Sequence, residues 1–231
     1  MAAFDKRAVF RDHPLFGALS AEAITRLASY AHNKAVPAGS PIFAKGDAGN
    51  SLFAVCAGTV KVSNQSADGK DAIFNLINAG EIFGEVALLD GQPRTADARA
   101  LTDCELMVIE RRDFIPLVKS EPDIALKLIE VLCARLRRTS EQVEDVLFLN
   151  LSARLAKTLL SLKERSPPGG RVRITQREIG QIIGISREST NKQLRIWQED
   201  KWIRLERGGV VVLAPDKLAE IAEEGADDAA W

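Results

Sequence analysis

The sequence predicts an α+β protein with an N-terminal antiparallel β-roll resembling a jelly roll, a long helix, and a C-terminal winged helix–turn–helix. Three observations predict it. Short strand-like segments separated by turn residues recur about every ten residues between 36 and 110. A heptad pattern occupies 122–148. Two capped helical segments flank a turn glycine between 174 and 200.

Length and composition are those of a globular protein. With 231 residues, 46% of them hydrophobic and 27% charged, the chain can form one or two domains with buried cores. No apolar run approaches the roughly 18 to 20 residues of a membrane-spanning helix, and the N-terminus lacks an apolar signal core. We therefore expect a cytoplasmic protein with no membrane partner. The widely spaced Cys56, Cys104 and Cys133 predict buried small hydrophobic residues.

The charges are unevenly distributed. From Leu151 to Ala214 there are 13 Lys and Arg against 6 Asp and Glu, a balance of +7. The rest of the chain has 18 against 26, a balance of −8, and the two balances sum to the net −1. A basic module joined to an acidic one favours nucleic acid as a partner of the C-terminal part.

The N-terminal half predicts short helices and then strands. Ser20 is a favourable N-cap for the apolar residues Ala23, Ile24 and Leu27, so residues 1–35 are expected to be helical. From Val36 onward, turn residues break the chain into short segments, and apolar and polar residues alternate in 58–64 and 104–111. The β-roll is therefore expected to end at about Glu110.

The segment from Pro122 to about Phe148 predicts one long helix. Its apolar seam follows spacings of 4 and 3 residues and consists of Ala125, Ile129, Leu132, Leu136, Thr139, Val143 and Val146. Such a seam indicates a parallel two-stranded coiled coil and hence a homodimer. The alternative is an amphipathic helix that packs on its own β-roll. The polar Thr139 weakens a dimer seam unless its hydroxyl finds a partner.

The C-terminal part begins with a helix over 151–164, for which Asn150 is a favourable N-cap, so a hinge is expected at 148–150. A loop over 166–170 and a short strand over 172–174 follow.

A helix–turn–helix comes next. Thr175 caps a first helix over 176–183 and forms a capping box with Glu178. Gly184 suits the left-handed turn, and Ser186 caps the second helix.

The second helix predicts an outward charged face. Because Leu194 and Trp197 suit its inner face, Arg187, Glu188 and Lys192 point outward. Strands over 203–205 and 210–213 complete a wing. A second helix of this kind enters the major groove, where arginine suits guanine and a carboxylate suits the cytosine amino group. The alternative is a solvated face. The candidate DNA-contacting residues are Thr175, Gln176, Ser186, Arg187, Glu188, Thr190, Asn191 and Lys192.

A candidate binding site lies in the stretch 83–96, FGEVALLDGQPRTA. Gly84 allows close approach of a ligand to the start of a short helix, where backbone N–H groups attract anions. Arg94 can fork onto phosphate oxygens. Glu85 suits a sugar hydroxyl or Arg94, and Thr95 adds a hydroxyl. Together these groups predict a nucleotide cradle.

This stretch resembles the phosphate-binding cassette of cyclic-nucleotide-binding domains, in the form found in the catabolite activator (CRP/FNR) family of bacterial regulators. The resemblance extends from about Phe16 to Leu213. It implies that ligand contacts come from Gly84, Glu85, Val86, Ala87, Arg94, Thr95 and Ala96.

The resemblance also assigns roles on the long helix and on DNA. Arg135 matches the position that reaches the nucleotide within one chain. Thr139 and Ser140 match the pair at the adenine, and Ser140 reaches the ligand of the partner chain. The family reads a TGTGA-like half-site, and Lys192 replaces an arginine that many members carry.

The expected function is a dimeric transcription regulator that binds double-stranded DNA under control of a cyclic nucleotide and works with RNA polymerase. By resemblance, Thr139 and Ser140 favour cAMP, whereas Thr95 resembles cGMP-binding cassettes, so cGMP stays open. A regulator that is not gated by a cyclic nucleotide is a further alternative.

Two other classes are disfavoured. A haem or iron–sulfur sensor needs an axial histidine or a cysteine cluster, but the only histidines are His13 and His32 and no cysteines are closely spaced. A metalloenzyme of cupin type needs histidines inside the barrel, and neither falls in the β region. We therefore expect no metal, haem or iron–sulfur cofactor and no enzymatic activity.

The expected organisation is a β-roll domain over 1–120, a dimerisation helix and hinge over 121–149, and a winged helix–turn–helix domain over 150–214. The acidic segment 215–231 predicts a short helix followed by a mobile tail.

Overall fold

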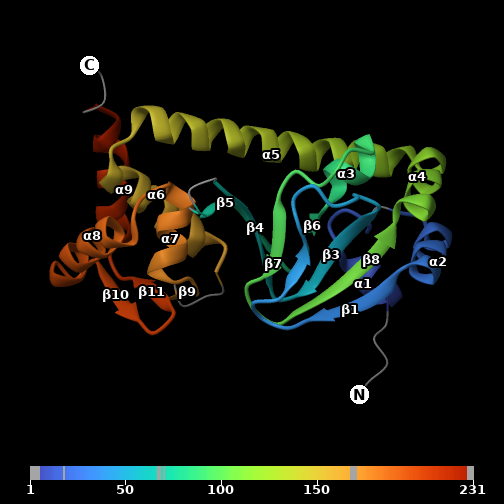
Figure 1. The fold of residues 1–231 in the computed structure, drawn as a ribbon, viewed down its shortest axis with the longest axis horizontal. Helices are drawn as coiled ribbons and strands as arrows, with labels where there is room; N and C mark the ends of the chain where they lie inside the picture. The colour runs from blue at the N-terminus through green and yellow to red at the C-terminus, as the bar shows by residue number, and fades with distance from the viewer. Residues whose placement is uncertain (1–5, 18, 67–68, 70, 167–170, 228–231) are drawn as a thin grey trace. The chain divides into compact units, whose positions relative to one another are not determined.

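The structure is a computed structural model that describes residues 6–17, 19–66, 69, 71–166 and 171–227. The chain divides into two compact units, Met1–Ala134 and Arg135–Trp231, and the boundary falls within helix α5 (Pro122–Phe148) (Figure 1). No helix in the described ranges combines the length and apolar content that crossing a bilayer requires.

The first unit is built on two four-stranded antiparallel sheets. One has the order β1-β8-β3-β6 and the other β2-β7-β4-β5. Their strands are β1 (His32–Val36), β2 (Pro41–Phe43), β3 (Ser51–Ala57), β4 (Thr59–Gln65), β5 (Asp71–Asn78), β6 (Ile82–Phe83), β7 (Asp97–Ala100) and β8 (Cys104–Glu110). The predicted antiparallel β-roll ending at Glu110 is confirmed.

Alternation along the strands divides the core into two layers. On β3, Leu52 and Ala54 pack against helices, whereas Phe53 and Val55 point between the two sheets. Successive side chains of a strand point to opposite faces, so one apolar strand serves both layers. Phe53 thereby faces the interior that also receives Phe83 at the end of β6.

The helices of the first unit are α1 (Lys6–Asp12), α2 (Ala21–Tyr30), α3 (Glu85–Asp90), α4 (Arg111–Ser120) and the start of α5. Figure 1 shows α2 and α4 beside β8. Ser20 caps α2, as predicted. One prediction was wrong here: the helical region ends at Tyr30 and not at residue 35, because His32–Val36 pairs with β8. Helix α4 was not predicted from the sequence, because it contains Pro116 and proline is unfavourable inside a helix.

The second unit contains α6 (Leu151–Glu164), α7 (Gln176–Ile183), α8 (Arg187–Glu199), α9 (Pro215–Asp227) and a three-stranded sheet of order β10-β11-β9. The strands are β9 (Arg171–Val172), β10 (Ile203–Glu206) and β11 (Gly209–Val212). The predicted winged helix–turn–helix is confirmed. Most of the predicted loop 166–170 lies outside the described residues.

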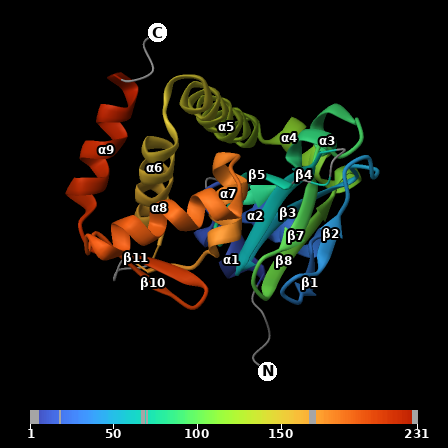
Figure 2. The same ribbon diagram turned by 60° about the vertical axis from the view of Figure 1, so that its left-hand side comes forward.

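The helix predicted after residue 214 is present as α9 and extends to Asp227. Figure 2 shows it running beside α6, with which it packs. Leu218 is fully buried, and a Cβ on Gly225 would lie 2.2 Å from the Cβ of Ala153. Glycine therefore allows α9 to pass close to the start of α6. The last four residues, 228–231, lie outside the described part of the chain.

The long helix α5 has the predicted bounds. Ile124 and Leu128 are buried in the core of the first unit. Many of its other large apolar side chains are exposed in the single chain, namely Leu126, Ile129, Leu136, Val143, Val146, Leu147 and Phe148. The prediction that all three cysteines are buried holds only for Cys104, because Cys56 is half-buried and Cys133 is exposed. Cys133 lies beyond Leu128, the last buried residue of α5, so it is exposed in the single chain.

His13 gives the first unit a predicted pH dependence. Its Nδ1 accepts a hydrogen bond from Leu15 N at 3.1 Å, and burial lowers its pKa from 6.5 to about 4 against a smaller opposing effect of the Glu81 backbone. The unfolded chain therefore binds the proton first as pH falls. The stabilising contribution is complete above pH 6.5 and is lost between 6.5 and about 4.

We expect the free energy of unfolding to fall by up to about 1.4 kcal/mol per pH unit in this window from His13 alone. Urea denaturation at several pH values measures it. His13→Asn keeps an acceptor for Leu15 N and should flatten the slope, whereas His32→Gln, on exposed β1, should not. Equal slopes in all three proteins would contradict the assignment.

Candidate functional site

The candidate site of the first unit begins at the turn between β6 and α3. Gly84 has φ 81°, a left-handed conformation that favours glycine, and it occupies the N-cap of α3. Gly91 ends α3 in a second left-handed conformation, and Arg111 Nε donates to the Leu88 carbonyl at 2.6 Å. The short helix is therefore fixed at its C-terminal end by the next part of the roll.

Arg94 is the central side chain of this site and is only 4% exposed. Its Nη1 donates to the Gly84 carbonyl at 2.7 Å, and its Nη2 donates to the Ser51 carbonyl at 2.7 Å and to Ser51 Oγ at 3.1 Å. The Arg94 backbone N–H donates to the Asp47 carbonyl at 2.8 Å. Arg94 therefore joins the α3 turn to the start of β3 and to the loop before it.

Two aromatic rings lie beside the guanidinium, and a third packs against them. Arg94 Cζ lies 4.2 Å from the ring centroid of Phe43 and 5.6 Å from that of Phe53. Phe53 stacks on Phe83 at 4.9 Å between centroids, and Phe43 lies 5.9 Å from Phe83. A cation over an aromatic face is attracted by the ring quadrupole, so this cluster favours the charged guanidinium in an otherwise apolar interior.

The guanidinium retains unused hydrogen-bonding capacity. Arg94 Nε is buried and has no hydrogen-bond partner among the described residues. Burial lowers the pKa of Arg94, and the negative charges of Glu85, Asp47 and Glu110 oppose this shift. A buried donor without an acceptor is costly, so the site favours an additional acceptor such as an anion oxygen.

The other predicted cassette residues fall into two groups. Glu85, Ala87 and Ala96 are buried together with Arg94 around the turn. Val86 and Thr95 are exposed, and the Thr95 carbonyl accepts from Asn64 Nδ2 at 3.3 Å. Sequence reasoning missed Ser51 and Phe43, because nothing in their local pattern distinguishes them from ordinary strand residues.

The predicted ligand residues on α5 belong to the second compact unit, which begins at Arg135. Thr139 and Ser140 are exposed on the helix, and Arg135 is partly buried. Their contact with a nucleotide stays a prediction.

The helix–turn–helix of the second unit has the predicted caps. Thr175 and Glu178 form a reciprocal capping box, with bonds of 2.8 Å and 3.2 Å. Gly184 ends α7 with φ 73°, and Ser186 Oγ accepts from Ser189 N at 3.1 Å to cap α8. These short-range bonds set where each helix begins.

The structure corrects one member of the predicted DNA-contacting set. Thr190 is fully buried, and its hydroxyl donates to the Ser186 carbonyl at 2.9 Å. It faces α7, where a Cβ on Gly180 would lie 2.8 Å from Thr190 Oγ1. Thr190 therefore packs the two helices together and does not reach the outer surface.

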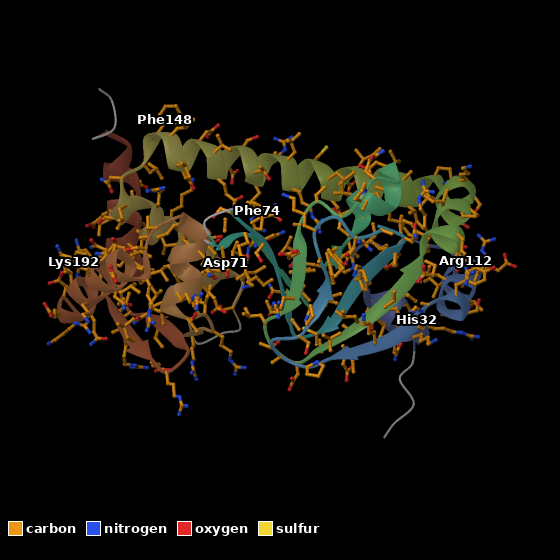
Figure 3. All side chains as sticks on the ribbon, in the orientation of Figure 1. His32, Asp71, Phe74, Arg112, Phe148 and Lys192 are labelled. Atoms are coloured by element: carbon orange, nitrogen blue, oxygen red, sulfur yellow. The ribbon has the colours of Figure 1, made fainter. Side chains whose placement is uncertain are left out.

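The remaining predicted residues lie nearer the surface. Thr175, Ser186, Arg187, Glu188 and Lys192 are exposed, and Gln176 is half-buried. Figure 3 shows Lys192 at the outer surface of α8. Asn191 is half-buried, and its Oδ1 has no hydrogen-bond partner in the described part of the chain.

A groove of about 420 Å³ runs between the helix starts and the wing. It is lined by Ile174, Thr175, Gln176, Arg177, Arg187, Glu206, Gly208 and Gly209. Three of the predicted DNA-contacting residues thus share one surface. Sequence reasoning missed Arg177 and Glu206. The position of Arg177 beside Gln176 could have indicated that it lines the groove. Glu206 reaches the groove only through the pairing of the wing strands, which the local sequence does not reveal.

The described residues contain no group of three or more His, Cys, Asp and Glu side chains that could hold a metal ion.

Two family models match the chain. A cyclic nucleotide-binding domain model matches residues 33–121, and a Crp-like helix-turn-helix domain model matches residues 153–221. The Arg94 site lies within the first match and the groove within the second.

Known proteins match over most of the chain. A CRP-like cAMP-activated global transcriptional regulator of Mycobacterium tuberculosis (strain CDC 1551 / Oshkosh) is 32% identical over 214 residues, covering 90% of this chain and 96% of the relative. The cAMP-activated global transcriptional regulator CRP of Salmonella typhimurium is 34% identical over 190 residues, covering 80% and 90%. The crystal structure of Thermus thermophilus Catabolite Activator Protein aligns with a TM-score of 0.53 and 33% identity, covering 92% and 100%.

Gly84 provides a test of how firmly Arg94 is held. A Cβ on Gly84 would lie 2.6 Å from Arg94 Nη1, and φ 81° adds backbone strain. Gly39 is a matched control, because it has φ 80° and nothing within 4 Å of its added Cβ. Gly39→Ala should lower the free energy of unfolding by about 1 kcal/mol, because alanine is strained in the left-handed backbone conformation.

Gly84→Ala should cost at least about 1 kcal/mol more, because it also displaces a buried, hydrogen-bonded guanidinium. Urea denaturation of the two variants measures the difference. If both variants lose the same free energy of unfolding, the Arg94 guanidinium moves aside without an energetic cost.

Proposed function

Because the chain belongs to the CRP/FNR family of transcriptional regulators, we propose that it is a homodimer whose sequence-specific affinity for double-stranded DNA is set by cAMP. The chain is a regulator and not an enzyme, with a cyclic nucleotide-binding domain and a helix–turn–helix. The observation that carries the effector proposal is Arg94, a buried guanidinium with an unpartnered Nε beside a glycine turn.

In the proposed complex the phosphate binds at the α3 turn. Arg94 Nε donates to a phosphate oxygen, supported by the backbone of Gly84, Val86 and Ala87 and by the Thr95 hydroxyl. Glu85 accepts from a ribose hydroxyl, because a carboxylate close to the phosphate itself would repel it. Ala96 is the last of the proposed ligand-contacting residues of this segment.

The identity of the base rests on other residues. The two curated relatives are described as cAMP-activated, which supports cAMP here. Arg135 and Thr139 are proposed to reach the nucleotide of their own chain and Ser140 that of the partner. The specific alternative is cGMP, which the exposed hydroxyl-bearing Thr95 favours because this group can meet the guanine amino group.

The dimer is proposed to form along α5. Ile129, Leu136, Val143 and Val146 are exposed seam residues of the single chain, and pairing two such helices removes their side chains from water. The proposed division of labour is nucleotide binding by 1–120, dimerisation by 121–149 and DNA binding by 150–214. Helix α9, within the C-terminal segment 215–231, supports α6.

The DNA contacts are proposed for the outward residues of α7 and α8. Arg187 would read guanine and Glu188 the cytosine amino group of a TGTGA-like half-site in the major groove. Two such helices in a dimer read a palindrome, with half-sites separated by about one helical turn or about 34 Å. Proposed supporting contacts come from Thr175, Gln176, Ser186, Asn191 and Lys192. We expect the protein to act in the cytoplasm and to contact RNA polymerase.

Ligand control requires that the nucleotide bind the DNA-competent dimer more tightly than the other state. A coupling of about 1 to 3 kcal/mol, or about 5- to 150-fold in DNA affinity, is typical of such systems. Thr139 suits this role, because its hydroxyl on an otherwise apolar seam is satisfied only with ligand present.

Two substitutions should separate the two binding activities. Arg94→Leu should weaken cAMP binding by about 10- to 100-fold, because it removes a charge-assisted donor. Arg187→Gln should remove discrimination between a TGTGA-type palindrome and scrambled DNA while cAMP affinity stays unchanged. Calorimetry with cAMP and cGMP, and fluorescence anisotropy with both duplexes, measure these effects.

The matched controls are exposed arginines outside both sites. Arg99→Leu lies on β7, and Arg165→Gln follows α6, so both should behave like the wild type. Circular dichroism verifies that each variant folds. Arg94→Lys keeps the positive charge but lacks the planar set of N–H donors of the guanidinium. Unchanged cAMP affinity in Arg94→Leu would show that the pocket lies elsewhere.

The dimer seam has its own test. Leu136 is 68% exposed, and Leu136→Glu should convert a micromolar dimer to monomers in sedimentation velocity, because it places a charge in each half of the seam. Glu144→Lys, on the same helix but off the seam, should leave the dimer intact. A wild-type monomer with and without cAMP would disprove the proposed dimer.

A further inference from the structure

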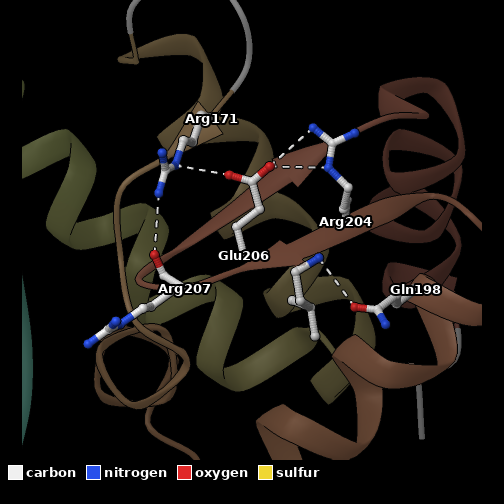
Figure 4. A network of polar contacts seen from close by, with 6 residues as sticks. Arg171, Gln198, Arg204, Glu206 and Arg207 are labelled. Atoms are coloured by element: carbon white, nitrogen blue, oxygen red, sulfur yellow. Dashed lines mark hydrogen bonds and ion pairs between the residues drawn. The ribbon is translucent and has the colours of Figure 1, made fainter.

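The wing carries an ion-pair network centred on one carboxylate (Figure 4). Glu206 Oε2 lies 3.2 Å from Arg171 Nε, and Glu206 Oε1 lies 3.1 Å from Arg204 Nη2. Arg204 Nε also donates to Oε1 at 3.1 Å, and Arg171 Nη2 donates to the Arg207 carbonyl at 3.3 Å. Both oxygens of Glu206 are therefore engaged by arginines.

The strand register explains why these side chains meet. Arg204 of β10 and Arg171 of β9 both pair with Val211 of the central strand, so they stand in one row across the sheet. Glu206 pairs with Gly209. A Cβ on Gly209 would lie 3.2 Å from Arg171 Nε, so the missing side chain leaves the room through which Arg171 reaches Glu206.

The network lies beside the surface that the proposed function assigns to DNA, and the following inference rests on that function. Glu206 lines the same groove as Thr175, Gln176 and Arg187. A DNA backbone that approaches this groove meets a carboxylate, which repels phosphate. It also meets two arginines whose charge is partly neutralised and whose N–H groups already point at Glu206 and at a backbone carbonyl.

Stability does not explain the network. The side chains of Arg171, Arg204 and Glu206 are 47%, 60% and 30% exposed. Ion pairs of this exposure add little to folding stability, because water and salt screen them. The charge balance matters more for DNA, since the three groups carry a net charge of +1 together and of +2 without Glu206.

We propose that Glu206 sets the strength of sequence-independent DNA binding without touching a base. It holds Arg171 and Arg204 back from the DNA phosphates and so weakens sequence-independent binding. Phosphate contacts strengthen binding to every sequence, whereas base contacts strengthen binding to one. A residue that suppresses phosphate contacts therefore lowers the affinity for every sequence by a similar factor and leaves discrimination to the base contacts.

The test compares the full-length protein with Glu206→Gln in the presence of cAMP. Fluorescence anisotropy measures affinity for a TGTGA-type palindrome and for a scrambled duplex of the same length across a salt series. We expect affinity for the scrambled duplex to rise by about 5- to 10-fold at low salt. The slope of log K against log [salt] should become steeper by about 1, and the affinity for the palindrome should rise by a similar factor.

Glu220→Gln is the matched control. It changes the net charge by the same amount and removes a carboxylate that is 2.6 Å from Lys217 Nζ, but Glu220 lies on α9 and does not line the groove. This variant should bind both duplexes like the wild type. Glu206→Ala should act in the same direction as Glu206→Gln, and circular dichroism checks that both fold.

The outcomes separate this inference from the proposed function. If the wild type binds no duplex, the proposed function fails and this inference fails with it. If the wild type binds the palindrome selectively but Glu206→Gln matches Glu220→Gln on scrambled DNA, only this inference is overturned. Weaker binding by Glu206→Gln would overturn it too, because Glu206 would then be orienting the arginines onto phosphates.

Discussion

Burial of one guanidinium organises the nucleotide-binding unit. Arg94 can be enclosed only because the Gly84 and Ser51 carbonyls accept its N–H groups and the Phe43 ring faces its cation. These partners come from β2, β3 and the α3 turn, so the side chain ties three segments of the roll together. An unpaired buried charge is strongly unfavourable, and this requirement fixes the turn geometry before any ligand binds.

The same enclosure supports the proposed phosphate contact of Arg94. Most of the guanidinium is already held by the protein, so little side-chain entropy remains to be lost when an anion meets Nε. Glu85 and Asp47 keep the charge favourable in a region whose burial disfavours it. The Arg94 guanidinium is therefore held in place by backbone and aromatic contacts.

The DNA-binding unit uses close backbone approach in place of buried charge. Gly180 faces Thr190 where α7 and α8 cross, and Gly209 gives Arg171 room to cross the wing. In both places the absence of a side chain lets a polar group reach its partner. The contact between Gly180 and Thr190 orients α8 against α7. The contact between Arg171 and Glu206 balances the charge of the wing. The orientation of helix α8 and the proposed strength of the unit's attraction to phosphate thus depend on separate residues.

The sequence by itself determined the features that depend on neighbouring residues. The caps at Ser20, Asn150, Thr175 and Ser186 were predictable because each hydrogen bond joins residues three positions apart. The Gly84–Arg94 cassette was predictable because its members are contiguous. Only the tertiary structure decided what Arg94 touches, since Ser51 lies 43 residues away. It also decided that Thr190 is buried, that Cys133 is exposed, and that Glu206 holds two arginines. These outcomes depend on helix crossing and strand register, which bring together residues that no local pattern connects.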